Sequence, residues 1–196
     1  NSLLYAQESQ LAFFAAELEL HEESAQWKAA CEHRASLCRK YLKDEKGNFY
    51  DYNVITGQRS TLASAACFYP LYSKMATPAE AEAAVKLLPR IEETYGISCC
   101  EKSDQEGVYQ WGYPNGWPPT HCIIVEGLLH YGYREDALRI ASKYVSLVER
   151  CFEQTGHFWE KYNVVDGNVE VADEYKMPAM LGWTFGVYVS FCKLLE

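Results

Sequence analysis

Residues 110–120 read QWGYPNGWPPT, a stretch that contains two tryptophans, three prolines and two glycines. Proline fixes the backbone φ angle and glycine adopts turn conformations, so this composition predicts a rigid loop. The side-chain amides of Gln110 and Asn115 each offer donors and an acceptor, which suits hydroxyl groups that both give and accept hydrogen bonds. Aromatic rings beside such amides favour a sugar-binding pocket over a purely structural loop. The residues expected to bind or enclose the sugar are Gln110, Trp111, Asn115 and Trp117.

Helical periodicity surrounds this loop on both sides. Apolar residues recur at the spacing of an amphipathic helix, and Thr77, Pro78 and Glu80 form a capping box with proline at the first helical position. The segment 47–58 is typical of a short hairpin or an ordered loop. Helix pairs separated by long loops predict an all-α fold in one domain, a toroid of helical hairpins with few or no short strands. The expected helices cover residues 2–20, 23–42, 62–74, 77 onward, 120–132, 135–152 and 178–195.

Two long loops, residues 100–119 and 156–177, are the places to look for chemistry. Loops longer than about 12 residues within a compact domain are usually functional. The second of them carries Glu160 and Glu174 in aromatic surroundings. Glycoside hydrolysis needs two carboxyl groups, of which one is an acid and the other a nucleophile or base, so Glu160 is a candidate for one of them. The alternative, in which Glu160 and Lys161 are solvated surface residues, stays open at this point.

The stretch QWGYPNGWPP resembles the second signature of the trehalases, glycoside hydrolase family 37, whose pattern is Q-W-D-x-P-N-G-W-x-P. Glu160-Lys161-Tyr162 resembles the E-K-Y-D element of that family. Glu174-Tyr175, followed by Gly182-Trp183-Thr184, resembles its G-E-Y…G-W-T-N-G element. Further collinear matches lie at 1–3, 50–53, 68–72 and 125–132, so the resemblance covers nearly the whole chain, residues 1–196.

This resemblance implies the C-terminal part of an (α/α)6 barrel and an inverting hydrolysis of α,α-trehalose to glucose. It assigns the role of catalytic base to Glu160, and it places Glu174 and Trp183 beside the bound sugar. In an inverting enzyme the base and the acid lie roughly 6.5–9.5 Å apart, which leaves room for the attacking water. The implied ligand is a small carbohydrate. No cofactor or metal is expected, since the five histidines show no paired metal-ligand spacing.

The chain departs from the family pattern at three positions. Gly112 stands where the signature has aspartate, Asn163 where the E-K-Y-D element has aspartate, and Phe185 where the last element has asparagine. The family's general acid, an aspartate, lies upstream of the segment that residues 1–3 resemble. The chain is therefore expected to supply the base but not the acid, and to be inactive or nearly so by itself.

These observations are compatible with three hypotheses of function. The first is the trehalase-like hydrolase described above. The second is a related (α/α)-barrel glucosidase that acts on another α-glucoside, for which Gly112 and Asn163 are the main support. The third is a catalytically silent helical module that binds sugars or packs against a partner chain. A half-ring of hairpins exposes apolar edges, so the expected partner is the N-terminal half of the barrel or a second copy of the chain.

Charge and composition exclude other functions. The net charge is −9, which leaves no positive footprint for nucleic acid or for an anionic membrane surface. No apolar run reaches the length of about 18 residues that a bilayer requires, and no signal-peptide pattern is visible. The eight cysteines lack a C-x-x-C metal pattern. They predict reduced, structural thiols and a cytoplasmic chain.

Overall fold

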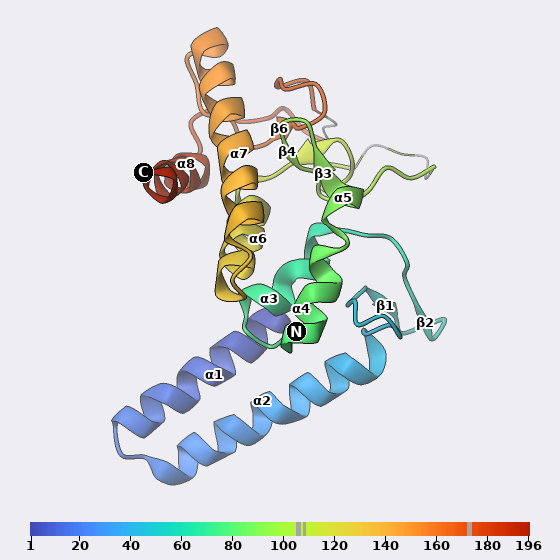
Figure 1. Cartoon of the computed structure of the whole chain (residues 1–196), viewed down its shortest axis with the longest axis vertical. Coiled ribbons are helices and arrows are strands. Elements are labelled where there is room, and N and C mark those ends of the chain that lie inside the picture. The colour runs from blue at the N-terminus through green and yellow to red at the C-terminus, as the bar shows by residue number, and fades with distance from the viewer. Residues whose placement is uncertain (105–106, 108, 172–173) are drawn as a thin grey trace.

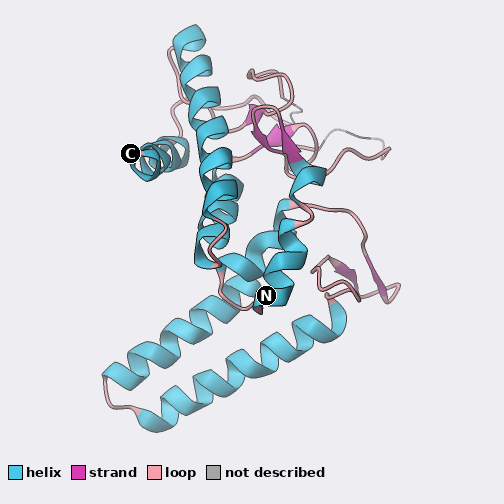
Figure 2. Cartoon of the chain, viewed as in Figure 1, coloured by secondary structure: helices cyan, strands magenta, loops and turns pink. Residues whose placement is uncertain are grey.

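The computed structural model describes residues 1–104, 107, 109–171 and 174–196, so parts of both long loops lie outside the described residues. Helices dominate the described residues, and every strand among them is two residues long (Figure 2). The prediction of an all-α fold with few short strands is therefore confirmed. None of the helices in this part of the chain is long and apolar enough to cross a membrane.

The first two helices, α1 (Ser2–Glu17) and α2 (His21–Tyr41), form a hairpin that extends away from the other helices (Figure 1). Glu8 and Arg34 join them through an ion pair of 2.6 Å. Asn1 occupies the N-cap position of α1. Its side chain does not cap the helix but accepts a hydrogen bond of 3.1 Å from Arg34, so the same guanidinium holds the start and the middle of α1.

One face of α1 and its C-cap is apolar and exposed. Leu4, Leu11, Phe14 and Leu18 recur along it at helical spacing, and we call these four residues the α1 stripe. The buried side chains of α1 are instead small or paired, namely Glu8, Ala12 and Ala15. An exposed apolar edge of this kind is what an incomplete ring of helical hairpins predicts.

The expected helix over residues 62–74 is shorter than predicted. It is a 3₁₀ turn, η1 (Ala65–Phe68), followed by the single-turn α3 (Tyr69–Tyr72). Ser64 pairs with Cys100 in an isolated β-bridge, so the backbone before η1 is extended and cannot be helical. The prediction is wrong there because a contact with a distant segment overrides the apolar periodicity.

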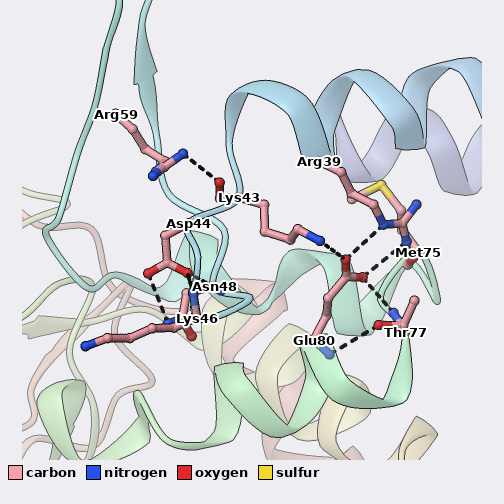
Figure 3. A network of polar contacts seen from close by, with 9 residues as sticks. All are labelled: Arg39, Lys43, Asp44, Lys46, Asn48, Arg59, Met75, Thr77 and Glu80. Atoms are coloured by element: carbon pink, nitrogen blue, oxygen red, sulfur yellow. Dashed lines mark hydrogen bonds and ion pairs between the residues drawn. The ribbon is translucent and has the colours of Figure 1, made fainter.

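The helix α4 (Pro78–Val85) begins with the predicted capping box, in which Thr77 and Glu80 each accept a hydrogen bond from the other's backbone N–H. The Glu80 carboxylate also binds Arg39 at 2.9 and 3.1 Å and Lys43 at 3.1 Å (Figure 3). Burial alone would raise the pKa of Glu80, but the hydrogen bonds to its charged form outweigh burial and lower the pKa to about 2. This carboxylate therefore links α2 to α4.

The main core lies between α6 (Pro118–His130), α7 (Arg134–Thr155) and α8 (Gly182–Leu195), with α6 alongside α7 in Figure 1. In that view α8 lies on one side of α7, and the short strands and long loops lie on the other. The helices thus lie behind the loops and support them. Large side chains that are fully buried in this core include Ile124, Leu128, Ile140, Tyr144 and Phe191.

The last helix starts at Gly182 rather than at residue 178 as predicted. Ala179 pairs with Trp159 in an isolated β-bridge, and Met180 has a φ of 63°. A residue whose backbone has this left-handed conformation ends the extended segment and cannot be part of a right-handed helix. The chain therefore turns at Met180 before α8 begins.

Short antiparallel ribbons join the remaining segments. For residues 47–58, where a short hairpin or an ordered loop was expected, the first ribbon shows a hairpin whose second strand ends at Arg59. The second ribbon directly follows the single-turn α5 (Leu88–Ile91). The third connects the two long loops to each other. The strands are β1 (Tyr52–Asn53), β2 (Gln58–Arg59), β3 (Glu92–Glu93), β4 (Gly96–Ile97), β5 (Asn115–Gly116) and β6 (Tyr162–Asn163).

Candidate functional site

The ribbon of β5 and β6 brings the two long loops together. Asn115 lies opposite Asn163, and Gly116 lies opposite Tyr162. A Cβ atom built on Gly116 would lie 2.3 Å from Cγ1 of Val164, so only glycine allows this approach. Residues that are far apart in the sequence are thereby held side by side.

The proline- and tryptophan-rich loop is fastened to the backbone carbonyl of Gln110. The indole N–H of Trp117 donates to this oxygen at 2.8 Å, and the side-chain amide of Asn115 donates to it at 2.9 Å. Both donating side chains are buried. These two side chains therefore determine the conformation of the loop from its interior and do not form its solvent-exposed surface.

Three tryptophan rings meet at this loop. Trp111 stacks flat on Trp117, with ring centroids 3.8 Å apart and planes 8° apart. Trp183, from the start of α8, meets Trp117 edge-on at 5.6 Å. Trp111 remains 49% exposed, so the stack offers an aromatic face to solvent and keeps its anchor inside.

Glu160 lies on the other loop with 8% of its surface exposed, so the reading of Glu160 and Lys161 as solvated surface residues is wrong. Its Oε2 atom accepts a hydrogen bond of 3.2 Å from the Lys161 ammonium and one of 2.5 Å from the Tyr175 hydroxyl. Lys161 is fully buried, and its Nζ lies 5.1 Å from the ring centroid of Trp117. The carboxylate is therefore connected through this lysine to the tryptophan cluster.

Glu174 and the side chain of Gln110 complete the set of predicted residues. Glu174 is exposed, and its Oε1 accepts a long hydrogen bond of 3.4 Å from the backbone N–H of Gln110. The side-chain Oε1 of Gln110 is buried and has no hydrogen-bond partner among the described residues. Since buried polar atoms are nearly always paired, this oxygen is a candidate for contact with a ligand.

A groove of about 950 Å³ runs beside this cluster. Trp111 and Gly112 belong to its lining, whereas Glu160 is not among the described lining residues. Its volume suits a small sugar. Other aromatic residues of the lining are Phe49, Tyr50, Tyr52, Tyr69, Tyr109 and Tyr113.

His121 supports the site from behind and is fully buried. The backbone N–H of Ile97 donates to its Nε2 at 2.8 Å, so Nδ1 carries the proton and donates to the carbonyl of Trp117 at 2.8 Å. Burial lowers the pKa of His121 to about 4. The histidine is structural and holds the start of α6 against β4.

A family model for Trehalase matches residues 1–196. The chain belongs to the trehalase family. It is 33% identical over 200 residues to the cytosolic neutral trehalase of Kluyveromyces lactis, a match that covers 93% of this chain and 26% of that protein. The chain spans about a quarter of the length of the fungal trehalases it matches, which include one from Eremothecium gossypii at 34% identity (93% of this chain, 27% of that protein).

A solved trehalase structure is also similar. Neutral trehalase Nth1 from Saccharomyces cerevisiae matches with a TM-score of 0.87 and 30% identity, over 100% of this chain and 37% of that one. This match places the helical hairpins of the chain in the architecture of the trehalase fold and agrees with the prediction of an incomplete helical barrel.

The departures from the trehalase pattern have different structural consequences. Asn163 is buried, and its Oδ1 accepts the backbone N–H groups of residues 165 and 166, so it forms a turn. Phe185 is exposed on α8 and packs against Phe158 at 5.4 Å. Gly112 alone among the three lines the groove.

Sequence reasoning missed two side chains of this trehalase-family site. Lys161 and Tyr175 both bind Glu160, although in the sequence they stand out only as parts of the E-K-Y and G-E-Y motifs. In a sequence, lysine next to glutamate is typical of a solvated pair, and no local pattern indicates that Lys161 is buried. Within the described residues, no group of three or more His, Cys, Asp or Glu side chains could hold a metal ion.

Proposed function

We propose that this chain is the C-terminal part of a trehalase barrel that hydrolyses α,α-trehalose to glucose with inversion, and that Glu160 is the base. The observation that carries the proposal is the Glu160 carboxylate, which is 8% exposed and tied to the tryptophan cluster through Lys161. A carboxylate held in this way can take a proton from a water molecule that attacks the sugar. The general acid is then an aspartate outside these residues, as the family resemblance implies.

The remaining site residues divide into two groups in this proposal. Trp111 offers its exposed face to the sugar, while Glu174 and the side-chain amide of Gln110 bind sugar hydroxyls. Trp117 and Asn115 shape the pocket through their hydrogen bonds to Gln110, and Trp183 supports Trp117 from its edge. The exposure of Trp111 and Glu174 supports this division, as do the buried Oε1 of Gln110, which has no hydrogen-bond partner among the described residues, and the burial of the two loop anchors.

The surroundings of the chain are also part of the proposal. Residues 1–196 act as one domain of the barrel, and the remaining helices of the barrel cover the α1 stripe. The exposed apolar side chains of that stripe and the coverage of only 37% of the Nth1 structure support this arrangement. Similar fungal enzymes are named cytosolic neutral trehalases, which supports a cytoplasmic location.

The test is glucose release from trehalose by the full-length protein that contains this chain, compared with its Glu160→Gln variant. Loss of a general base lowers turnover by about 10²- to 10⁴-fold. The matched control is Glu153→Gln, which changes an exposed glutamate of α7 and should leave turnover unchanged. Because Glu160 balances the buried Lys161 ammonium, the melting temperature of each variant is measured as well. Equal turnover in wild type and Glu160→Gln would refute the role of Glu160.

A second candidate is hydrolysis of another α-glucoside, and the observation that favours it is Gly112 in the groove lining. A signature aspartate is replaced there by a residue with no side chain, so a carboxylate that could bind the sugar is lost. Comparison of kcat/KM for trehalose with that for other α-glucosides separates the two candidates. Higher kcat/KM for another glucoside favours the second.

A further inference from the structure

The two oxygens of the Glu160 carboxylate are not equivalent. Within the described part of the chain, the Lys161 ammonium and the Tyr175 hydroxyl both donate to Oε2, and no hydrogen bond ends on Oε1. The donors come from two separate places in the loop, one from the next residue and the other from 15 residues later. Such convergence on one oxygen fixes the rotation of the carboxylate about its last side-chain bond.

The lysine is itself held in a defined place. Its side chain is fully buried, and its Nζ lies 5.1 Å from the ring centroid of Trp117 and 4.8 Å from that of Tyr175. An ammonium between two aromatic faces is stabilised by both rings. A buried ammonium also needs an anionic partner, and Glu160 is the carboxylate that its Nζ contacts at 3.2 Å. Tyr175 thus contributes its ring to the lysine and its hydroxyl to the glutamate.

We propose that Tyr175 and Lys161 are positioning residues for Glu160, which bind Oε2 so that Oε1 is the oxygen that receives the proton from the attacking water. This inference rests on the proposed function, because it gives Oε1 the role of the base. The water loses its proton to Oε1 as its oxygen bonds to the anomeric carbon, and the leaving sugar takes a proton from the acid. Neither positioning residue touches the sugar in this arrangement.

Tyr175→Phe is the decisive variant, because it removes one hydroxyl and keeps the ring beside Lys161. The side chain is 42% exposed, so the change leaves the core intact. We expect kcat for trehalose to fall by about 10- to 100-fold in the full-length protein, as for other residues that orient a catalytic group. KM should stay within about two-fold, since a residue that acts only in the transition state changes kcat. Tyr188→Phe is the matched control, because that hydroxyl donates to the exposed carboxylate of Glu149 at 3.0 Å instead of to Glu160.

A double-mutant cycle separates positioning from a general structural role. In the Glu160→Gln background, Tyr175→Phe should change neither the residual turnover nor the Kd for trehalose, because it acts through the carboxylate that is already lost. An equal loss of turnover in both backgrounds would overturn the inference. So would a Tyr175→Phe variant that retains wild-type kcat.

Failure of the proposed function looks different. In that case Glu160→Gln itself releases glucose as fast as the wild type, whatever the tyrosine does. Lys161→Met provides the second arm of the test and should also lower kcat at unchanged KM. Its melting temperature is measured because the side chain is fully buried, and the inference is judged on Tyr175→Phe if Lys161→Met does not fold.

Discussion

Trp111 lies flat against Trp117, with ring centroids 3.8 Å apart, and the two rings have opposite relations to solvent. Trp117 is buried and its indole N–H donates to the carbonyl of Gln110, whereas Trp111 is exposed at the groove. One ring therefore anchors the loop and the other forms its outer face. Such a pair gives a rigid aromatic surface, because the outer ring has no freedom to turn away without losing its stack.

We expect Trp111→Ala to weaken binding of the sugar and to leave the chemistry largely intact. Loss of uniform binding raises KM with little change in kcat, and loss of one aromatic contact corresponds to about a 10-fold increase in KM. Steady-state kinetics of the full-length protein measure both constants. Phe152→Ala is the control, since Phe152 is similarly exposed on α7 at 41%. A large fall in kcat at constant KM would contradict the role of Trp111 as a platform.

Gly116→Ala should destabilise the protein strongly. The added Cβ would lie 2.3 Å from Cγ1 of Val164 and 2.7 Å from the carbonyl oxygen of Ile97. Overpacking against a backbone atom costs about 2 kcal/mol or more, and it would push apart the β5–β6 ribbon. The free energy of unfolding from urea denaturation measures the loss.

The matching control for this substitution is Gly186→Ala. Gly186 lies within α8, and a Cβ added there meets no atom within 4 Å. Alanine in a helix interior should increase the free energy of unfolding by about 0.5–1 kcal/mol. The two substitutions are therefore expected to change the free energy of unfolding in opposite directions. Equal destabilisation by both would show that lack of space around Gly116 is not the cause of the effect.

The buried His121 should make stability depend on pH above the range where carboxylates titrate. Its pKa is lowered to about 4 by burial, while the unfolded chain has the ordinary value of 6.5. Between these two pKa values the unfolded state binds a proton that the native state does not bind. The contribution of His121 to the free energy of unfolding is therefore fully present above pH 6.5 and is lost as the pH falls towards 4. The loss is about 2 kcal/mol between pH 7 and pH 5 and at most about 3 kcal/mol in all.

Urea denaturation at several pH values tests this dependence. In His121→Gln the titrating group is absent, so the free energy of unfolding should change less between pH 7 and pH 5 than in the wild type. The exposed histidines, such as His33 and His157, serve as controls when replaced by glutamine. The idea is refuted if wild type and His121→Gln show parallel pH dependence.

Local signals predicted much of the fold, and distant contacts explain where the prediction failed. Thr77 and Glu80 form their capping box from neighbouring residues alone, so the start of α4 follows from the sequence. The late start of α8 follows from the bridge between Ala179 and Trp159, which no local pattern reveals. Prediction from the sequence therefore succeeds where the ends of a helix depend on neighbouring residues, and it fails where they depend on contacts with distant segments.

The candidate site shows the same division. Its two loops were recognisable by composition and by their resemblance to trehalases. Their alignment was not, because it depends on pairing Asn115 with Asn163 across the β5–β6 ribbon. The burial of Lys161 between Trp117 and Tyr175 is likewise a product of tertiary packing, since a lysine in a loop is ordinarily solvated.

The α1 stripe predicts how residues 1–196 behave when they are prepared on their own. Exposed apolar side chains at helical spacing form a surface that another helix can cover, so without the rest of the barrel the chain should self-associate. Sedimentation velocity should show dimers or larger species, with the fraction of monomer increasing on dilution. Leu11→Lys combined with Phe14→Lys places two charges in the middle of the stripe and should shift the population to monomer.

The control for this shift must add the same charge at apolar positions outside the stripe. Val54 and Ile55 are 84% and 92% exposed between β1 and β2, so Val54→Lys combined with Ile55→Lys changes net charge equally. If association depends on the stripe, this control remains associated while the stripe variant dissociates. Dissociation of both would assign the effect to net charge, and a wild-type chain that is monomeric at all concentrations would show that the stripe needs no partner.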